Sequence, residues 1–62
     1  MLRKINFQDP GAHVNLGAML HLNGKFQEAI AHYQTALKLD PHDELALENL
    51  KKLIPHWKMP NL

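Results

Sequence analysis

Apolar residues recur at helical spacing in two stretches of the chain, and helix-breaking residues follow each stretch. This spacing predicts amphipathic helices over residues 10–22 and 26–39. The apolar positions of the first helix are Val14, Leu16, Ala18, Met19, Leu20 and Leu22. Those of the second helix are Phe26, Ala29, Ile30, Tyr33, Ala36 and Leu37. Because the connection between them is short, the two helices are expected to pack antiparallel.

The boundaries of these helices have local signals. Asp9 can accept hydrogen bonds from the free amides of a first turn, and Pro10 suits the first helical position, where no donor is needed. Gly24 is the residue type that adopts the left-handed conformation just past a helix, so it is expected to end the first one. An Asn–Gly pair also marks β-hairpins, but alternating apolar strands do not flank this pair. Pro41 disfavours helical geometry in the residue before it and ends the second helix.

A third helix is predicted over residues 43–54, where Asp43 and Glu44 place negative charge at the positive helix end. Its apolar side consists of Leu45, Leu47, Leu50, Leu53 and Ile54. The chain is therefore expected to be all-α. It divides into a flanking segment (1–9), a helix–turn–helix unit (10–41), a third helix (42–54) and an irregular tail (55–62).

The stretch from residue 12 to 41 resembles one unit of the tetratricopeptide repeat (TPR) family. The family pattern is Trp-x2-Leu-Gly-x2-Tyr, then Ala-x3-Phe, then Pro. The residues at these positions are His13, Leu16, Gly17, Leu20, Ala29, Tyr33 and Pro41. Two large aromatics are replaced, but the Leu-Gly, Ala, aromatic and Pro positions are kept. The resemblance implies a helical hairpin that is one unit of an α-solenoid.

The third helix resembles the first helix of a following unit. At the repeat offset of about 34 residues, Ala12 aligns with Ala46 and Leu16 with Leu50. Gly17, however, aligns with Lys51. A lysine suits a helix with nothing packed on its outer side, so the third helix is expected to be the polar cap that closes a repeat array. The alternative, a generic three-helix bundle, treats these matches as chance.

Small residues are expected where the helices approach most closely. Gly17 and Ala29 are assigned to the contact between the first two helices, and Ala36 to the contact with the third, because larger side chains would force the axes apart. The space between the helices is expected to be filled by Leu16, Leu20, Phe26, Ile30, Tyr33, Leu37, Leu47 and Leu50.

Composition limits the possible functions. With 62 residues, a chain buries only about 60% of the surface that its unfolded form exposes, so its stability should be marginal. The net charge of +1 argues against nucleic-acid binding, which needs a dominant basic face.

No apolar run approaches the roughly 20 residues of a membrane-spanning helix, so this fragment is expected to be soluble and not to insert into a membrane. The absence of cysteine excludes disulfides and leaves the compartment unknown.

Catalysis is not expected, and no cofactor is implied. The sequence lacks a supported Ser-His-Asp order, a phosphate-binding glycine loop and a paired-carboxylate signature. The histidines do not show the i, i+4 spacing of a helical zinc site, so they are expected to be surface or boundary residues and not metal ligands. They are His13, His21, His32, His42 and His56.

A protein or extended peptide is the expected partner, because the resemblance implies binding on the concave surface made by the first helices of successive repeats. Helical spacing assigns nine residues to this surface: Val14, Asn15, Ala18, His21, Leu22, Leu45, Glu48, Asn49 and Lys52. Asn15 and Asn49 occupy equivalent positions, and their amides can pair with both the donor and the acceptor of a peptide backbone. The positions look similar to an asparagine ladder in the array of O-linked N-acetylglucosamine transferase. The alternative is that both amides are solvated or cap local backbone.

The same run also looks like the last repeat and cap of the transmembrane-and-TPR proteins of the endoplasmic reticulum, which are implicated in protein O-mannosylation with the chemistry in the membrane part. Three functions follow. The first is a non-catalytic protein-interaction or scaffold module that binds a peptide or stacks on neighbouring repeats. The others are a self-associating structural repeat, and a regulatory terminal piece of a membrane glycosyltransferase.

Overall fold

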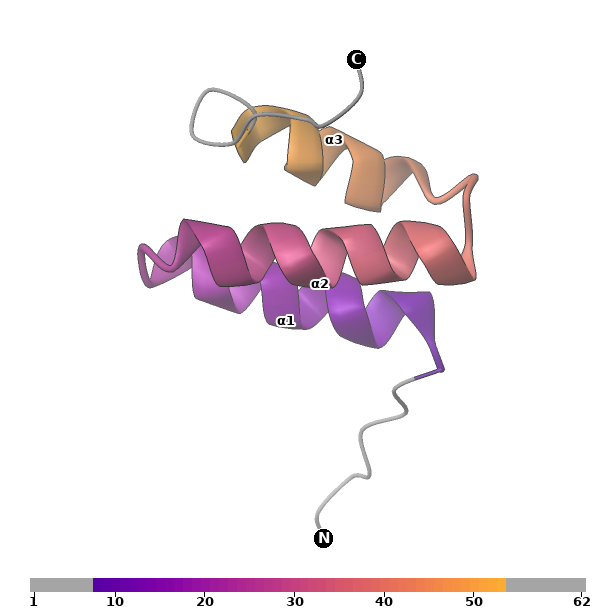
Figure 1. Cartoon of the computed structure of the whole chain (residues 1–62), viewed down its shortest axis with the longest axis horizontal. Coiled ribbons are helices and arrows are strands. Elements are labelled where there is room, and N and C mark those ends of the chain that lie inside the picture. Colours follow the sequence, from indigo (N-terminus) through magenta and orange to yellow (C-terminus); the bar gives the residue numbers. More distant parts are fainter. Residues whose placement is uncertain (1–7, 54–62) are drawn as a thin grey trace, which may run out of the picture.

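The computed structural model describes residues 8–53, which form three α-helices in chain order. They are α1 (Pro10–Leu22), α2 (Phe26–Leu39) and α3 (Glu44–Leu53). Figure 1 shows α1 and α2 running side by side, with α3 on the other side of α2. Each outer helix therefore packs mainly on α2, and α1 and α3 touch each other little. The expected all-α helix–turn–helix unit followed by a further helix is confirmed.

α1 begins and ends as the local signals predict. The Asp9 side chain accepts a hydrogen bond from the Gly11 amide at 2.9 Å, and Pro10 is the first helical residue. At the other end Gly24 has a φ of 77°, the left-handed conformation that favours glycine. The Lys25 amide donates to the Leu20 carbonyl at 2.9 Å and the Gly24 amide donates to the His21 carbonyl at 3.0 Å. These two bonds form a Schellman motif, which satisfies carbonyls that the helix end leaves free.

The connection between α2 and α3 is held by two aspartates. Asp40 is extended, with φ −142° and ψ 95°, and this conformation ends α2. Its side chain accepts from the His42 amide at 3.1 Å. Asp43 then accepts from the Ala46 amide at 3.1 Å and caps α3. α3 thus begins at Glu44, and its expected end at Ile54 lies outside the described residues, as do segments 1–7 and 55–62.

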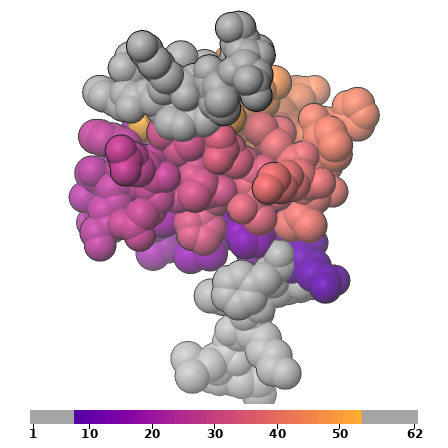
Figure 2. Space-filling model, viewed as in Figure 1, coloured from indigo at the N-terminus to yellow at the C-terminus, as the bar shows by residue number. Residues whose placement is uncertain are grey.

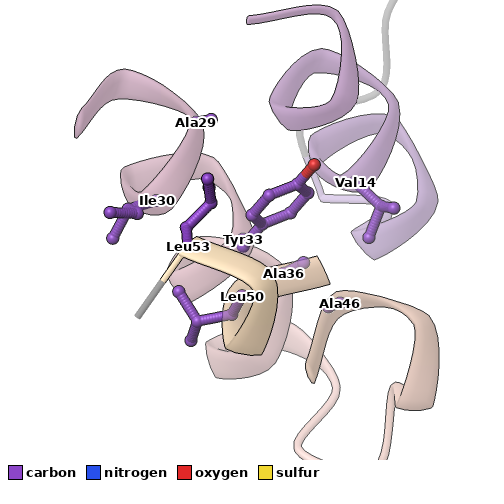
Figure 3. Packing of buried hydrophobic residues seen from close by; sticks show 8 residues of the cluster. All are labelled: Val14, Ala29, Ile30, Tyr33, Ala36, Ala46, Leu50 and Leu53. Carbon is purple, nitrogen blue, oxygen red and sulfur yellow. The ribbon is translucent and has the colours of Figure 1, made fainter. Parts of the chain in front are cut away.

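The core lies between α2 and the two helices that flank it (Figure 3). Its buried apolar members are Val14, Ala29, Ile30, Tyr33, Ala36, Ala46, Leu50 and Leu53. Tyr33 extends from α2 toward α1, with its hydroxyl oxygen on the α1 side. The alanines at 29, 36 and 46 have no exposed surface, so the helix axes approach closely at each of them.

One core expectation needs correction. Leu47 was expected to fill the space between the helices, but 40% of its surface is exposed. The buried residues of α3 are Ala46, Leu50 and Leu53. Their i, i+4, i+7 spacing places them on one face of the helix, and Leu47 lies at the edge of that face. Lys51 is exposed, as expected of a helix with a solvated outer side.

Candidate partner-binding surface

The residues of α1 assigned to the partner surface differ widely in exposure. Leu22 is 88% exposed and Asn15 is exposed, whereas Ala18 and His21 are half-buried. His21 lies against Phe26 across the turn, with ring centroids 5.6 Å apart and ring planes at 71°. This edge-to-face contact holds the His21 ring at the end of α1.

Val14 does not belong to an exposed surface in this structure. Its side chain is only 3% exposed and is part of the core. Figure 3 shows it on α1 beside the Tyr33 side chain. Periodicity alone does not decide which flank of a broadly apolar helix faces inward, and this helix turns Val14 toward the core.

On α3 the assigned residues lie at or near the surface. Leu45 is 58% exposed, Glu48 and Lys52 are exposed, and Asn49 is half-buried. α1 and α3 have few contacts with each other. The position of the α1 residues relative to the α3 residues therefore depends on the packing of both helices on α2.

α1 presents apolar surface beyond the predicted set. Its 13 residues include no Asp, Glu, Lys or Arg, and Met19 is 61% exposed. In the space-filling view α2 fills the middle of the visible face and α1 appears along its lower edge (Figure 2). Because apolar side chains are exposed on a helix that carries no charge, α1 is suited to a further contact that would remove them from water. The absence of charge in residues 10–22 is the sequence signal for this property.

One histidine expectation is wrong. His13 was expected at the surface or boundary, but its side chain is only 7% exposed. Its Nδ1 atom lies 3.2 Å from Nδ1 of His32, at hydrogen-bond distance; the ring centroids are 5.4 Å apart and the ring planes meet at 26°. The two residues are 19 positions apart on α1 and α2, so spacing within a single helix gave no signal for the pair.

The described residues contain little that suggests catalytic or metal chemistry. Within residues 8–53, no group of three or more His, Asp or Glu side chains is placed to hold a metal ion. Burial raises the pKa of the Tyr33 hydroxyl by desolvation; this tyrosine belongs to the core and not to an open site. In the same part of the chain, no helix has the length and apolar character that crossing a bilayer requires.

Comparison with known proteins agrees with this arrangement. A family model described as tetratricopeptide repeat matches residues 10–43, which span α1, α2 and the turn into α3. No solved structure matches the chain.

Several longer proteins are similar to the chain. Human protein O-mannosyl-transferase TMTC2 is 54% identical over 44 residues, which are 71% of this chain and 5% of that protein. Human protein O-mannosyl-transferase TMTC1 is 40% identical over 50 residues, 81% of this chain and 6% of that protein. The peroxisomal targeting signal receptor of Candida glabrata is 36% identical over 50 residues, 81% of this chain and 8% of that protein. The chain thus corresponds to a small part of each relative.

Proposed function

The chain belongs to the tetratricopeptide repeat family, and from this premise we propose that it is a non-catalytic module that holds an extended peptide segment of another protein. The single observation that carries the proposal is the exposure of apolar side chains on the first and third helices. Leu22 is 88% exposed and Leu45 is 58% exposed. Burying such side chains against a partner removes apolar surface from water, which favours association.

The polar residues of the same surface would give the contact its orientation. The side-chain amides of Asn15 and Asn49 can each donate to a peptide carbonyl and accept from a peptide amide. Glu48 and Lys52, both exposed on α3, add one charge of each sign. The proposed partner is therefore an extended segment with apolar side chains and mixed charge, bound partly through its backbone. Ala18 and His21 complete the proposed surface, whereas Val14 remains in the core.

Similarity to the peroxisomal targeting signal receptor supports this class of partner. By its name, that protein is a receptor for a targeting signal, and it is similar to this chain over 50 residues. Recognition of a targeting signal is consistent with the kind of binding proposed here.

The proposal is tested by selecting a phage-displayed library of random peptides on the immobilised 62-residue chain. A selected peptide is then titrated against the chain by fluorescence anisotropy. Leu22→Ser and Asn49→Ala should each weaken binding, by roughly tenfold for the amide if one backbone hydrogen bond is lost. Gln27→Ala, an exposed position on α2, is the matched control and should leave binding unchanged. Equal affinity for all variants would contradict the proposed surface.

Self-association is the second candidate function, and the uncharged α1 favours it. Met19 and Leu22 are both exposed on this helix, so a second copy of the chain can be proposed as the covering partner. Sedimentation equilibrium at several concentrations distinguishes the two proposals. A peptide-binding monomer keeps its mass on dilution, whereas a self-associating repeat loses mass and should be made monomeric by Met19→Lys.

A third candidate follows from similarity to protein O-mannosyl-transferases. The 54% identity to TMTC2 supports the proposal that the chain serves as a repeat-bearing, regulatory or partner-holding piece of such an enzyme, in the endoplasmic reticulum, while other parts carry the chemistry. The test is to delete the matching segment from human TMTC2 and measure mannosyl transfer to protein acceptors. An unchanged rate with every acceptor would contradict this proposal.

A further inference from the structure

Two imidazoles meet across the interface of the helical hairpin. His13 on α1 is 7% exposed, and its Nδ1 atom lies 3.2 Å from Nδ1 of His32 on α2. The ring centroids are 5.4 Å apart and the ring planes meet at 26°. Because the two nitrogens face each other directly, the number of protons they share determines whether the contact is attractive.

A hydrogen bond between two ring nitrogens needs one N–H donor and one lone-pair acceptor. Two neutral imidazoles satisfy this requirement when one carries its proton on Nδ1 and the other on Nε2. One added proton keeps the bond, because an imidazolium N–H donates to the lone pair of the neutral partner. A second added proton places N–H groups on both facing nitrogens. The hydrogen bond is then lost, and two like charges face each other at the same distance.

Within residues 8–53, the charged groups on the neighbouring elements do not change this requirement. α1 carries no Asp, Glu, Lys or Arg, and the Asp9 side chain that caps it accepts from the Gly11 amide. On α2, Glu28 is exposed one turn before His32, and Tyr33 follows His32 in the chain. A nearby carboxylate can offset one positive charge, but it does not restore a lone pair between two N–H groups. The other ionisable groups of the described residues are His21, Lys25, Lys38, Asp40, His42, Asp43, Glu44, Glu48, Lys51 and Lys52. Arg3, Lys4, His56 and Lys58 lie outside the described residues.

We propose that the His13–His32 pair makes the α1–α2 hairpin acid-sensitive. The folded hairpin accepts one proton at the pair and loses stability with the second. In the unfolded chain the two imidazoles are far apart and each binds a proton independently, near pH ~6.5. The unfolded state therefore binds more protons in acid, and stability falls as the pH falls. Because a chain of this size has little stability to lose, acidification below neutral pH separates α1 from α2 and removes any surface that depends on their packing.

The experiment is urea unfolding of the 62-residue chain followed by circular dichroism, at about pH 7.5 and about pH 5, on either side of the usual imidazole titration. The unfolding constant should rise by roughly tenfold between these pH values, the size expected when one part-buried hydrogen bond is lost. In His32→Gln the amide can still pair with His13 without taking up a proton, so most of this pH dependence should disappear. His42→Gln is the matched control, because His42 is exposed in the turn between α2 and α3; it should retain the full dependence.

Equal pH dependence in the parent chain, His32→Gln and His42→Gln would overturn the proposal. So would a parent chain that shows no helical signal at about pH 7.5, because the pair would then not exist in the free protein. A second readout applies even if His32→Gln does not fold. In imidazole NMR spectra of the parent chain, His13 and His32 should take up protons in two separated steps. A single step that coincides with that of His42 would equally overturn the proposal.

Discussion

Gly17 on α1 lies so close to the ring of Tyr33 on α2 that a Cβ atom at Gly17 would stand 2.6 Å from Cε1 of the ring. The same atom would stand 2.8 Å from Cδ1, and real Cβ atoms do not approach other atoms this closely. Tyr33 is only 1% exposed, so its ring has little room to move away. The absence of a side chain at Gly17 thus lets the ring of Tyr33, the largest fully buried side chain, pack directly against the backbone of α1.

Gly17→Ala should therefore destabilise the chain, although alanine is the better helix former. The gain in helix propensity is about 1 kcal/mol, while overpacking costs about 1–3 kcal/mol. Thermal unfolding followed by circular dichroism measures the net loss. Gly11→Ala is the matched control, because its Cβ would meet only the flexible Asp9 side chain, at 3.3 Å. If both variants gain stability, the close contact is not a constraint. In a Tyr33→Leu background the Gly17→Ala penalty should shrink, as a double-mutant cycle would show.

Ala29→Leu should unfold the domain. Ala29 has no exposed surface, and three added carbons have no space there, so the cost should reach about 3 kcal/mol. Ala31→Leu makes the same change on the exposed side of the same helix and should leave the melting temperature nearly unchanged. Equal melting temperatures for the two variants would contradict the packing of α2 described above. Gln34→Ala, at a half-buried position, should have a small effect.

Gly24→Ala should cost about 1–2 kcal/mol through the backbone alone. No atom lies within 4 Å of a Cβ built at Gly24, yet its φ is 77°. Gly24→Asn should lose less, because asparagine tolerates the left-handed conformation better than alanine. Chemical denaturation of the three chains should rank them glycine, asparagine, alanine. A result in which alanine equals glycine would show that the turn adopts another conformation in solution.

Alkaline pH should destabilise the chain through Tyr33. Burial raises the pKa of its hydroxyl above the ordinary value of 10.0, so the folded state disfavours the phenolate more than the unfolded state does. The contribution of this group is fully present below pH 10 and is lost as the pH rises through the raised pKa of the folded state. Urea unfolding across this range should show a smaller loss of stability in Tyr33→Phe. An identical loss in both chains would assign the alkaline effect to the lysines.

The boundaries of the helices were predictable from the sequence because their causes are local. Asp9 caps the amide two residues away, and Gly24 takes its own backbone conformation in the turn. The close contact at Gly17 was predictable too, since a glycine inside a helical pattern that otherwise favours larger residues indicates close packing. These features depend on neighbours in the chain or on the repeat frame, and the structure confirms them.

The two main departures both depend on contacts between helices. The partner of His13 is 19 residues away, so nothing within α1 indicated that a polar ring would be buried there. Val14 was expected on the partner surface but is buried, and Leu47 was expected in the core but is exposed. The rotation of each helix about its axis is set by its neighbour, and a broad apolar face allows several rotations. The set of side chains that a partner can reach depends on that same rotation.

The arrangement in which α2 lies between the two other helices has a kinetic consequence. Each helix packs mainly on the one that precedes or follows it in the chain, so the native contacts join residues that are close in sequence. Such contacts form without closing long loops, and helical proteins of this kind fold in about microseconds to milliseconds. Folding should therefore proceed from turn to turn along the chain. The hairpin of α1 and α2 can form before α3 adds its buried residues, Ala46, Leu50 and Leu53. Partial loss of structure should therefore begin at α3.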